Sequence, residues 1–258
     1  MKFFIKAVLF VSLFIFPMVA QAAHPLITDD TETQGKGRFQ IEVNGQYESE
    51  KETVAGVSVK GSGTEIEALV SYGVAEHMDV VVGVPYKTIK VTEDGATLLD
   101  ESGNGDVSLE LKWKFYEKNG CSLGFKPGVS LPAGDEDKGL GAGKTGYSAF
   151  FIASREAGDW AFHVNAGYVR HDNKIDERKD IMHVSVAAVK EVSEKVKAVA
   201  NIGMESNSDP ASGTKPTFGL IGAIYSVSKD LDVDFGVKFG LNEPEVDYAV
   251  LAGMAYRF

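Results

Sequence analysis

The sequence predicts an all-β protein, an up-and-down antiparallel transmembrane β-barrel of about twelve strands. Three features carry this prediction: an export signal at the start, a period-two alternation of apolar and polar residues in the rest, and connections that alternate between short and long. The chain has 258 residues, a formal net charge of −11 and 44% hydrophobic residues. The acidic balance argues against a nucleic-acid partner, because a surface that binds nucleic acid has to be basic.

Residues 1–22 have the layout of a secretory signal peptide. Lys2 and Lys6 give a positive start, Ala7–Val19 is mostly apolar, and Ala20-Gln21-Ala22 is a small-x-small cleavage site. The apolar run is short for a membrane-spanning helix, which needs about 20 residues. We therefore expect an exported mature chain that starts at Ala23.

Residues 23–37 show no alternation, and Pro25, Gly35 and Gly37 discourage pairing in a β-ladder. The segment precedes the first expected strand, so we expect it on the periplasmic side of the barrel. Two alternatives stay open. The segment is either a gate or plug whose acidic residues, such as Asp29, pair with bases inside the lumen, or a mobile periplasmic tail.

Residues 38–258 are expected to form the barrel. In Phe39–Tyr47 every odd residue is apolar or glycine and every even residue is polar, which is typical of a strand with one face in lipid and one in water. Val186–Val199 also fits a helical spacing, but its neighbours favour a strand, a tight turn and a strand. The expected strands are Phe39–Tyr47, Glu65–Gly73, Asp79–Tyr86, Asp106–Phe115, Cys121–Leu131, Tyr147–Arg155, Trp160–Tyr168, Met182–Val189, Val196–Glu205, Thr217–Ser226, Leu231–Gly240 and Tyr248–Phe258.

The expected connections differ in length in a regular way. Short ones are expected at Val74–Met78, Glu117–Gly120, Glu156–Asp159, Val192–Lys195 and Val227–Asp230. Long ones are expected at Ser49–Gly63, Thr92–Gly105, Ala133–Lys144, Arg170–Asp180 and Asn207–Pro216, with a shorter one at Leu241–Val246. Short turns at one end and long loops at the other are typical of bacterial outer-membrane barrels. Such a sheet has to close on itself, because lipid offers no hydrogen bonds to a free edge.

The polar faces of the expected strands would line the lumen. Acids and bases are nearly balanced over these inward positions, which argues against strong selectivity for one sign of charge. A soluble core could not bury so many charges at acceptable cost. The lumen-lining candidates are Arg38, Glu42, Glu65, Glu67, Glu110, Lys112, Lys114, Lys126, His163, His183, Lys197, Asp232, Asp234 and Lys238.

The last six residues of the chain resemble the C-terminal signal of outer-membrane barrel proteins. Gly253, Tyr256 and the terminal Phe258 match that signal, whereas Leu251 stands where a polar residue is usual. The resemblance implies recognition by the barrel-assembly machinery. We therefore expect the cell outer membrane of a Gram-negative bacterium as the location, with its lipid and lipopolysaccharide as partners.

The sequence predicts no cofactor, no metal site and no enzyme. The single cysteine and the scattered histidines lack the spacing of metal ligands. Gly139–Thr145 lacks the first glycine and the following helix of a phosphate-binding loop. Ser185 lies two residues from His183 on one face, but no G-x-S-x-G elbow is present. A lipid hydrolase therefore remains only a third alternative.

The start of the mature chain, His24–Gly37, resembles that of the family "Putative MetA-pathway of phenol degradation". Matching pieces recur at Gly83–Tyr86, Gly105–Leu109, Lys126–Gly134 and Gly222–Ser226. The resemblance implies an outer-membrane barrel that passes small organic molecules, and it carries over no catalytic or binding residue. We expect a channel or transporter for small-molecule solutes, including small organic or aromatic compounds. The alternative is a structural or plugged barrel that acts through its external loops.

Overall fold

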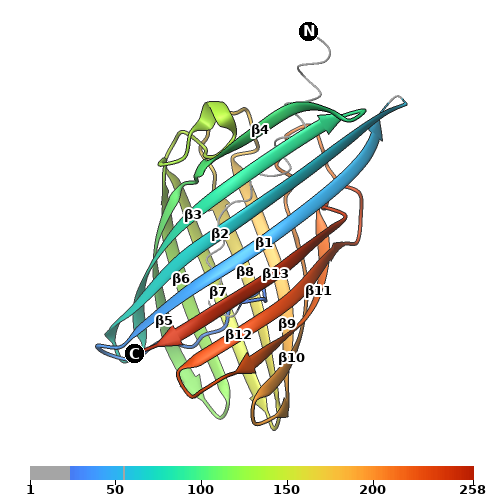
Figure 1. Cartoon of the computed structure of the whole chain (residues 1–258). Helices are drawn as coiled ribbons and strands as arrows, with labels where there is room; N and C mark the ends of the chain where they lie inside the picture. Colours follow the sequence, from blue (N-terminus) through green and yellow to red (C-terminus); the bar gives the residue numbers. More distant parts are fainter. Residues whose placement is uncertain (1–23, 55) are drawn as a thin grey trace.

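The computed structural model describes residues 24–54 and 56–258, so the expected signal peptide lies outside the described residues. Within them, thirteen strands form one antiparallel sheet (Figure 1). A turn of 3-10 helix, η2 (Glu136–Lys138), lies between two of these strands. In this part of the chain, no helix is both long and apolar enough to cross a membrane. The strands are β1 (Phe39–Val54), β2 (Val57–Ala75), β3 (Met78–Glu93), β4 (Ala96–Asn104), β5 (Val107–Lys118), β6 (Cys121–Leu131), β7 (Gly146–Ala157), β8 (Trp160–Arg170), β9 (Asp180–Ser193), β10 (Val196–Glu205), β11 (Thr217–Ser226), β12 (Leu231–Gly240) and β13 (Tyr248–Arg257).

The sheet closes because β1 pairs with both β2 and β13. The described strands form a ring of twelve, since β4 and β5 share one place beside β3. The half of β3 that begins at Met78 pairs with β5, and the half that ends at Glu93 pairs with β4. Between these halves, the Gly105 N–H donates to the Pro85 carbonyl at 2.9 Å. The predicted all-β barrel is confirmed, with one of its strands interrupted.

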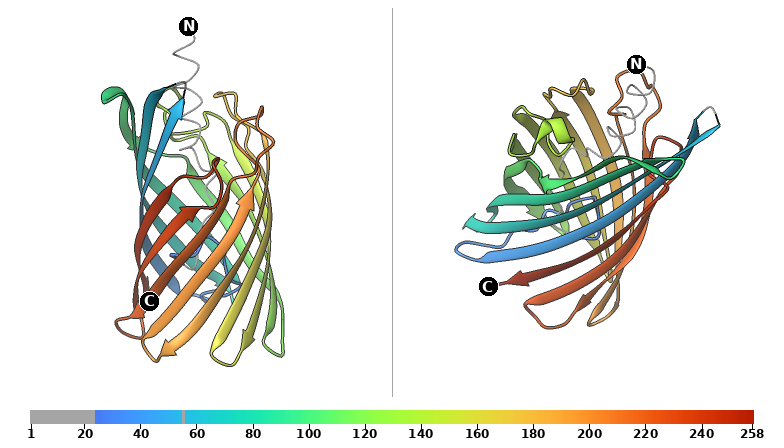
Figure 2. Two further views of the ribbon diagram at one scale, coloured as in Figure 1. Left: turned by 90° about the vertical axis from the view of Figure 1, so that its right-hand side faces the viewer. Right: turned by 45° about the horizontal axis from the view of Figure 1, so that its top comes forward.

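The two ends of the barrel differ as the sequence predicted (Figure 2). At the short-turn end, the connections at 76–77, 119–120, 158–159, 194–195 and 227–230 are tight. At the opposite, long-loop end, residues 132–145, 171–179, 206–216 and 241–247 lie outside the strands. The strand, turn and strand expected over Val186–Val199 are confirmed in β9 and β10.

The prediction of long loops is wrong for two segments, because the structure forms strands there. β1 and β2 continue through Ser49–Gly63 as a hairpin, with Lys51 opposite Lys60. Thr92–Gly105 contains a second hairpin, formed by β3 and β4. Both segments are rich in polar residues because they extend toward the end of the barrel, where both faces of a strand meet water. The alternation of apolar and polar residues therefore does not predict the strands in these two segments.

The barrel wall carries its apolar residues on the outside. Leu109 is 43% exposed on the outer face of β5, whereas the next residue, Glu110, is 4% exposed. In β1, the outward Ile41 and Val43 alternate with the buried Gln40, Glu42 and Asn44 in the same way. A soluble domain shows the opposite pattern, while a barrel in lipid requires an apolar exterior and tolerates a polar interior.

The loop between β6 and β7 folds across the long-loop end of the barrel. The Asp106 carboxylate holds this loop by accepting the N–H groups of Gly134 at 3.0 Å and Ala142 at 2.8 Å. Leu140 at its tip is buried against Ile89 and Val91. This loop is therefore held against the barrel wall near β3 and the start of β5.

Candidate functional site in the barrel lumen

Residues 24–37, called the strap from here on, lie inside the barrel in the half nearer the short turns (Figures 1 and 2). The strap follows the wall around the ring before it enters β1. Its side-chain partners lie, in order around the ring, on β12, β10, β8, β7, β6, β5 and β3. One short segment therefore contacts most of the circumference.

The first residues of the strap dock on glycines. A β-carbon at Gly236 would lie 2.8 Å from Pro25 Cβ, and one at Gly222 would lie 2.9 Å from Pro25 Cγ. These two glycines are paired directly across β11 and β12. A β-carbon at Gly253 would lie 2.6 Å from His24 Nδ1. The three glycines therefore form a shallow depression, called the glycine seat from here on, which any larger side chain would fill.

Apolar packing continues at the next residue of the strap. Leu26 is buried in a cluster with Val199, Leu220 and Leu251, which all face the lumen. His24 Nδ1 also contacts the Asp234 carboxylate at the start of the strap. This end is therefore held mainly by shape and by the exclusion of water from apolar surface.

Two asparagines bind the backbone in the middle of the strap. Asn201 Oδ1 accepts the N–H groups of Ile27 at 2.8 Å and Thr28 at 3.0 Å. Asn165 accepts the Asp29 N–H at 2.7 Å and donates to its carbonyl at 2.8 Å. Within the described residues, this middle part of the strap is not paired with a strand backbone. The asparagine side chains therefore satisfy backbone groups that would otherwise be buried without partners.

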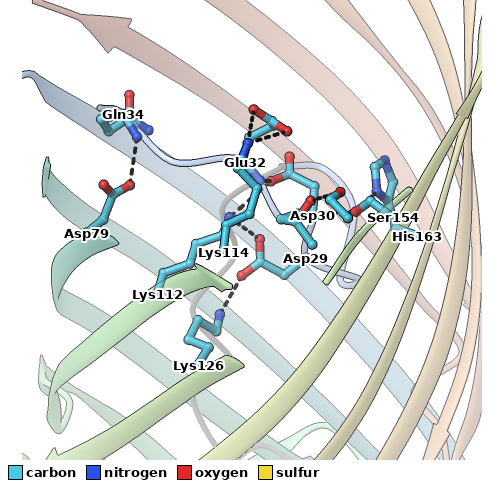
Figure 3. Close-up of polar contacts among 12 residues, drawn as sticks. Asp29, Asp30, Glu32, Gln34, Asp79, Lys112, Lys114, Lys126, Ser154 and His163 are labelled. Atoms are coloured by element: carbon cyan, nitrogen blue, oxygen red, sulfur yellow. Dashed lines mark hydrogen bonds and ion pairs between the residues drawn. The ribbon is translucent and has the colours of Figure 1, made fainter. Parts of the chain in front are cut away.

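Ion pairs hold the acidic part of the strap (Figure 3). The Asp29 carboxylate lies 2.9 Å from Lys112 Nζ and 2.7 Å from Lys126 Nζ, and its side chain is 1% exposed. Asp30 contacts Lys112 at 3.0 Å, and Glu32 contacts Lys114 at 3.4 Å. Burial raises the pKa of Asp29, but the two ammonium groups outweigh burial and hold that pKa below its usual value. Asp29 is therefore ionised.

The strap then passes into β1 under close contact with β2 and β3. The Gln34 N–H donates to Asp79 at 2.9 Å, and the Gly37 N–H donates to the Gly73 carbonyl at 2.7 Å. A β-carbon at Gly73 would lie 1.8 Å from the Gly35 carbonyl oxygen. The C-terminal end of the strap is therefore fixed by close backbone packing, which leaves no room for a side chain at Gly73.

The sequence-derived candidates fall in three places. The first group contacts the strap directly or, for His163, through Ser154: Lys112, Lys114, Lys126, His163 and Asp234. The second group lies elsewhere on the inner wall, half-buried or buried: Glu42, Glu65, Glu67, Glu110, His183, Asp232 and Lys238. The third group is exposed and borders a cavity of about 640 Å³: Arg38 and Lys197.

Sequence reasoning missed the residues that hold the strap without charge, namely the two asparagines and the three glycines. A signal was present, because Asn165 and Asn201 are inward polar residues inside strongly apolar strands. Gly222, Gly236 and Gly253 likewise occupy inward positions. Recognising either set requires knowing that the strap lies against them.

Ser185 and His183 do meet, but in a position that does not suit a lipid hydrolase. Ser185 Oγ lies 3.0 Å from His183 Nε2, and Glu205 lies 3.4 Å from His183 Nδ1. Ser185 is buried on the lumen side, whereas Val184 and Val186 beside it are exposed on the outer face. Membrane lipid meets that outer face, so this serine does not face a lipid substrate.

Metal chemistry gains no support from the side-chain arrangement. In residues 24–54 and 56–258, no group of three or more His, Cys, Asp or Glu side chains is arranged to hold a metal ion.

Comparison with known proteins places the chain among barrels of similar size. The model of the family "Putative MetA-pathway of phenol degradation" matches residues 23–258. No curated protein matches the chain. An outer membrane channel from Pseudomonas putida F1 is similar in structure, with a TM-score of 0.67 at 14% identity over 89% of this chain and 98% of that one.

Two further solved structures share the fold. The NanC porin has a TM-score of 0.55 at 10% identity, over 84% of this chain and 98% of that chain. The translocator domain of the autotransporter NalP from Neisseria meningitidis has a TM-score of 0.53 at 12% identity, over 88% and 91% of the two chains. At these identities the likeness shows a common barrel fold.

Proposed function

This chain belongs to the family "Putative MetA-pathway of phenol degradation", and from that premise we propose that it is a channel for small-molecule solutes in the outer membrane of a Gram-negative bacterium. The observation that carries the proposal is the closed barrel with an apolar exterior and a polar interior. Such a wall separates an aqueous route from lipid. The similar structures include an outer membrane channel and a porin, which supports the same function.

Small organic or aromatic compounds are the proposed solutes. The family description refers to phenol degradation. The strap supports a limit on solute size, because it occupies lumen space that bulky molecules would need. We propose that the strap narrows the route and that its displacement widens it.

A plugged barrel that acts through its external loops is the second candidate. It is favoured by the number of strands that the strap contacts and by the buried ion pairs of Asp29. In that case the lumen would stay closed to solutes in the intact protein. The two candidates make opposite predictions for conductance.

The decisive experiment compares the mature protein with a form that starts at Arg38. Both are refolded, their folding is checked by heat-modifiable gel mobility, and each is recorded in planar bilayers. Liposome swelling with matched aromatic and aliphatic solutes then ranks the solutes. We expect small conductance from the mature protein and several-fold larger conductance from the truncated form, because the strap no longer occupies the lumen.

Each failure has a separate meaning. A mature protein that passes neither ions nor solutes contradicts the channel and favours the plugged barrel. Equal conductance and solute uptake from two folded forms contradicts the role of the strap while leaving the channel intact.

Assembly through the C-terminus is part of the same proposal. The Phe258 N–H donates to the Phe39 carbonyl at 2.9 Å, and the rings of Tyr256 and Phe258 lie 4.7 Å apart. We propose that the barrel-assembly machinery binds this ending before the barrel closes. Deleting Phe258 should lower the yield of protein in the outer membrane, measured by fractionation, while Arg257→Lys should not. A normal yield after the deletion contradicts this role.

A further inference from the structure

The cavity of about 640 Å³ lies at the short-turn end of the barrel, beside the acidic part of the strap. Asp30 and Glu32 of the strap border this cavity, together with Lys112 of the barrel wall. A volume of this size is in the range of sites that hold a small organic molecule. The ion pairs of the strap are therefore within reach of a solute that occupies the cavity.

Lys112 joins the strap at the border of the cavity (Figure 3). Its Nζ lies 2.9 Å from the Asp29 carboxylate and 3.0 Å from the Asp30 carboxylate. The Lys112 side chain is 4% exposed and that of Asp29 is 1% exposed, whereas the side chain of Asp30 is 21% exposed. Of the two acids, Asp30 is the one that borders the cavity. Asp30 is therefore the partner of Lys112 that a solute can replace.

The strap itself shows which chemical group the wall binds here. Its carboxylates accept charge-assisted hydrogen bonds from Lys112 and, through Glu32 at 3.4 Å, from Lys114. A free carboxylate carries the same charge and accepts the same N–H donors, whereas a neutral carboxamide lacks the charge that strengthens these bonds. The strap therefore acts as an intramolecular ligand, and soluble carboxylates are the compounds that compete with it.

Other groups around the cavity suit an organic anion. Arg38 and Lys197 are exposed and border the cavity, and in the part of the chain that the structure describes neither base forms an ion pair. Val81 adds apolar surface for a hydrocarbon group. Asp79 borders the cavity as well, but its carboxylate already accepts a backbone N–H of the strap at 2.9 Å. The cavity thus combines available bases with room for a small hydrocarbon body.

We propose that this cavity binds a small organic carboxylate, which competes with Asp30 for Lys112. A bound carboxylate removes one of the ion pairs that hold the strap, so the solute loosens the segment that restricts its own route. The binding site stands on the geometry of the cavity and of the Asp30–Lys112 pair. The passage of such carboxylates through the lumen rests on the proposed channel function.

The test measures binding of benzoate to the refolded mature protein in detergent by isothermal titration calorimetry. The buffer contains no other carboxylate, and a titration into empty micelles is subtracted. Benzamide is the matched probe, because it has the same ring and a similar shape but no charge. We expect saturable binding of benzoate and roughly tenfold weaker binding of benzamide, since hydrogen bonds to a charged group are the stronger ones.

Two variants with opposite expected effects locate the site. Asp30→Asn should tighten the binding of benzoate several-fold, because it removes the carboxylate that competes for Lys112. Lys112→Gln should weaken the binding about tenfold, because it removes the ammonium group. Lys190→Gln is the control, since Lys190 pairs with Asp159 at 3.6 Å and does not border the cavity. This control should bind benzoate as the wild type does.

The outcomes separate the site from the channel. The proposal is overturned by an absence of benzoate binding, by equal binding of benzoate and benzamide, or by unchanged or weaker binding in Asp30→Asn. If Lys112→Gln does not fold, Asp30→Asn decides alone, because misfolding does not tighten binding. Calorimetry does not depend on conduction, so a protein that binds benzoate but passes no solute contradicts only the channel function.

Discussion

The two walls of the lumen hold the strap by different means. The wall formed by β11–β13 offers glycines and apolar side chains, and it receives Pro25 and Leu26 by shape. The wall formed by β5 and β6 offers lysines, and it receives Asp29 by charge. A shape contact fails when a methyl group is added, whereas a buried ion pair fails when a charge is removed. The strap therefore has two attachments that mutation can break separately.

The largest effect is expected from the charged attachment. Asp29→Asn keeps the size of the side chain but leaves two buried ammonium groups with less compensation, and breaking such a pair costs about 3–5 kcal/mol. We expect the strap to detach and single-channel conductance to approach that of the form that starts at Arg38. Asp30→Asn is the control, because Asp30 is more exposed and pairs with one lysine, Lys112, whereas Asp29 pairs with two. If both variants conduct equally, Asp29 has no special role.

The shape attachment should give a smaller effect. Gly236→Ala places a methyl group 2.8 Å from Pro25 Cβ, and overpacking of this kind costs about 1–3 kcal/mol. We expect more frequent large openings in single-channel recordings, with an unchanged urea midpoint for the barrel itself. Gly213→Ala is the matched control, because a β-carbon at that position has no neighbouring atom within 4 Å. If Gly236→Ala shows large openings no more often than the wild type, the glycine seat does not hold the strap.

Acidification should have the smallest effect near neutral pH. The folded-state pKa of Asp29 lies below its ordinary value of 3.8, so its ion pairs are complete above that value and are lost as pH falls through the lower, folded-state pKa. Between pH 7 and pH 5, which both lie above the ordinary value of 3.8, the conductance of the wild type should not change through this group. A rise in wild-type conductance between pH 7 and pH 5 that is absent in Asp29→Asn would contradict this sign.

The glycine seat changes how the C-terminal signal is interpreted. Gly253 matches the proposed assembly signal in the sequence, and its β-carbon position lies against His24 in the structure. One residue thus fits two requirements, recognition before folding and strap packing afterwards. Sequence inspection alone finds only the first, because His24 is more than two hundred residues away in the chain.

The sequence by itself determined the barrel, its strand direction and the inward position of most charges. The alternation around Leu109 and Glu110 is a local pattern of the sequence. With lipid outside the barrel and water inside, only one orientation of such a strand places its apolar side chains in lipid and its polar side chains in water. The polar hairpins at Ser49–Gly63 and Thr92–Gly105 were not predicted, because water on both faces of a strand removes that alternation. Only the tertiary structure decided which lysines meet Asp29 and which asparagines bind the strap backbone. Those contacts join strands far apart in the sequence, and the curvature of the closed ring, which no local pattern encodes, brings them together.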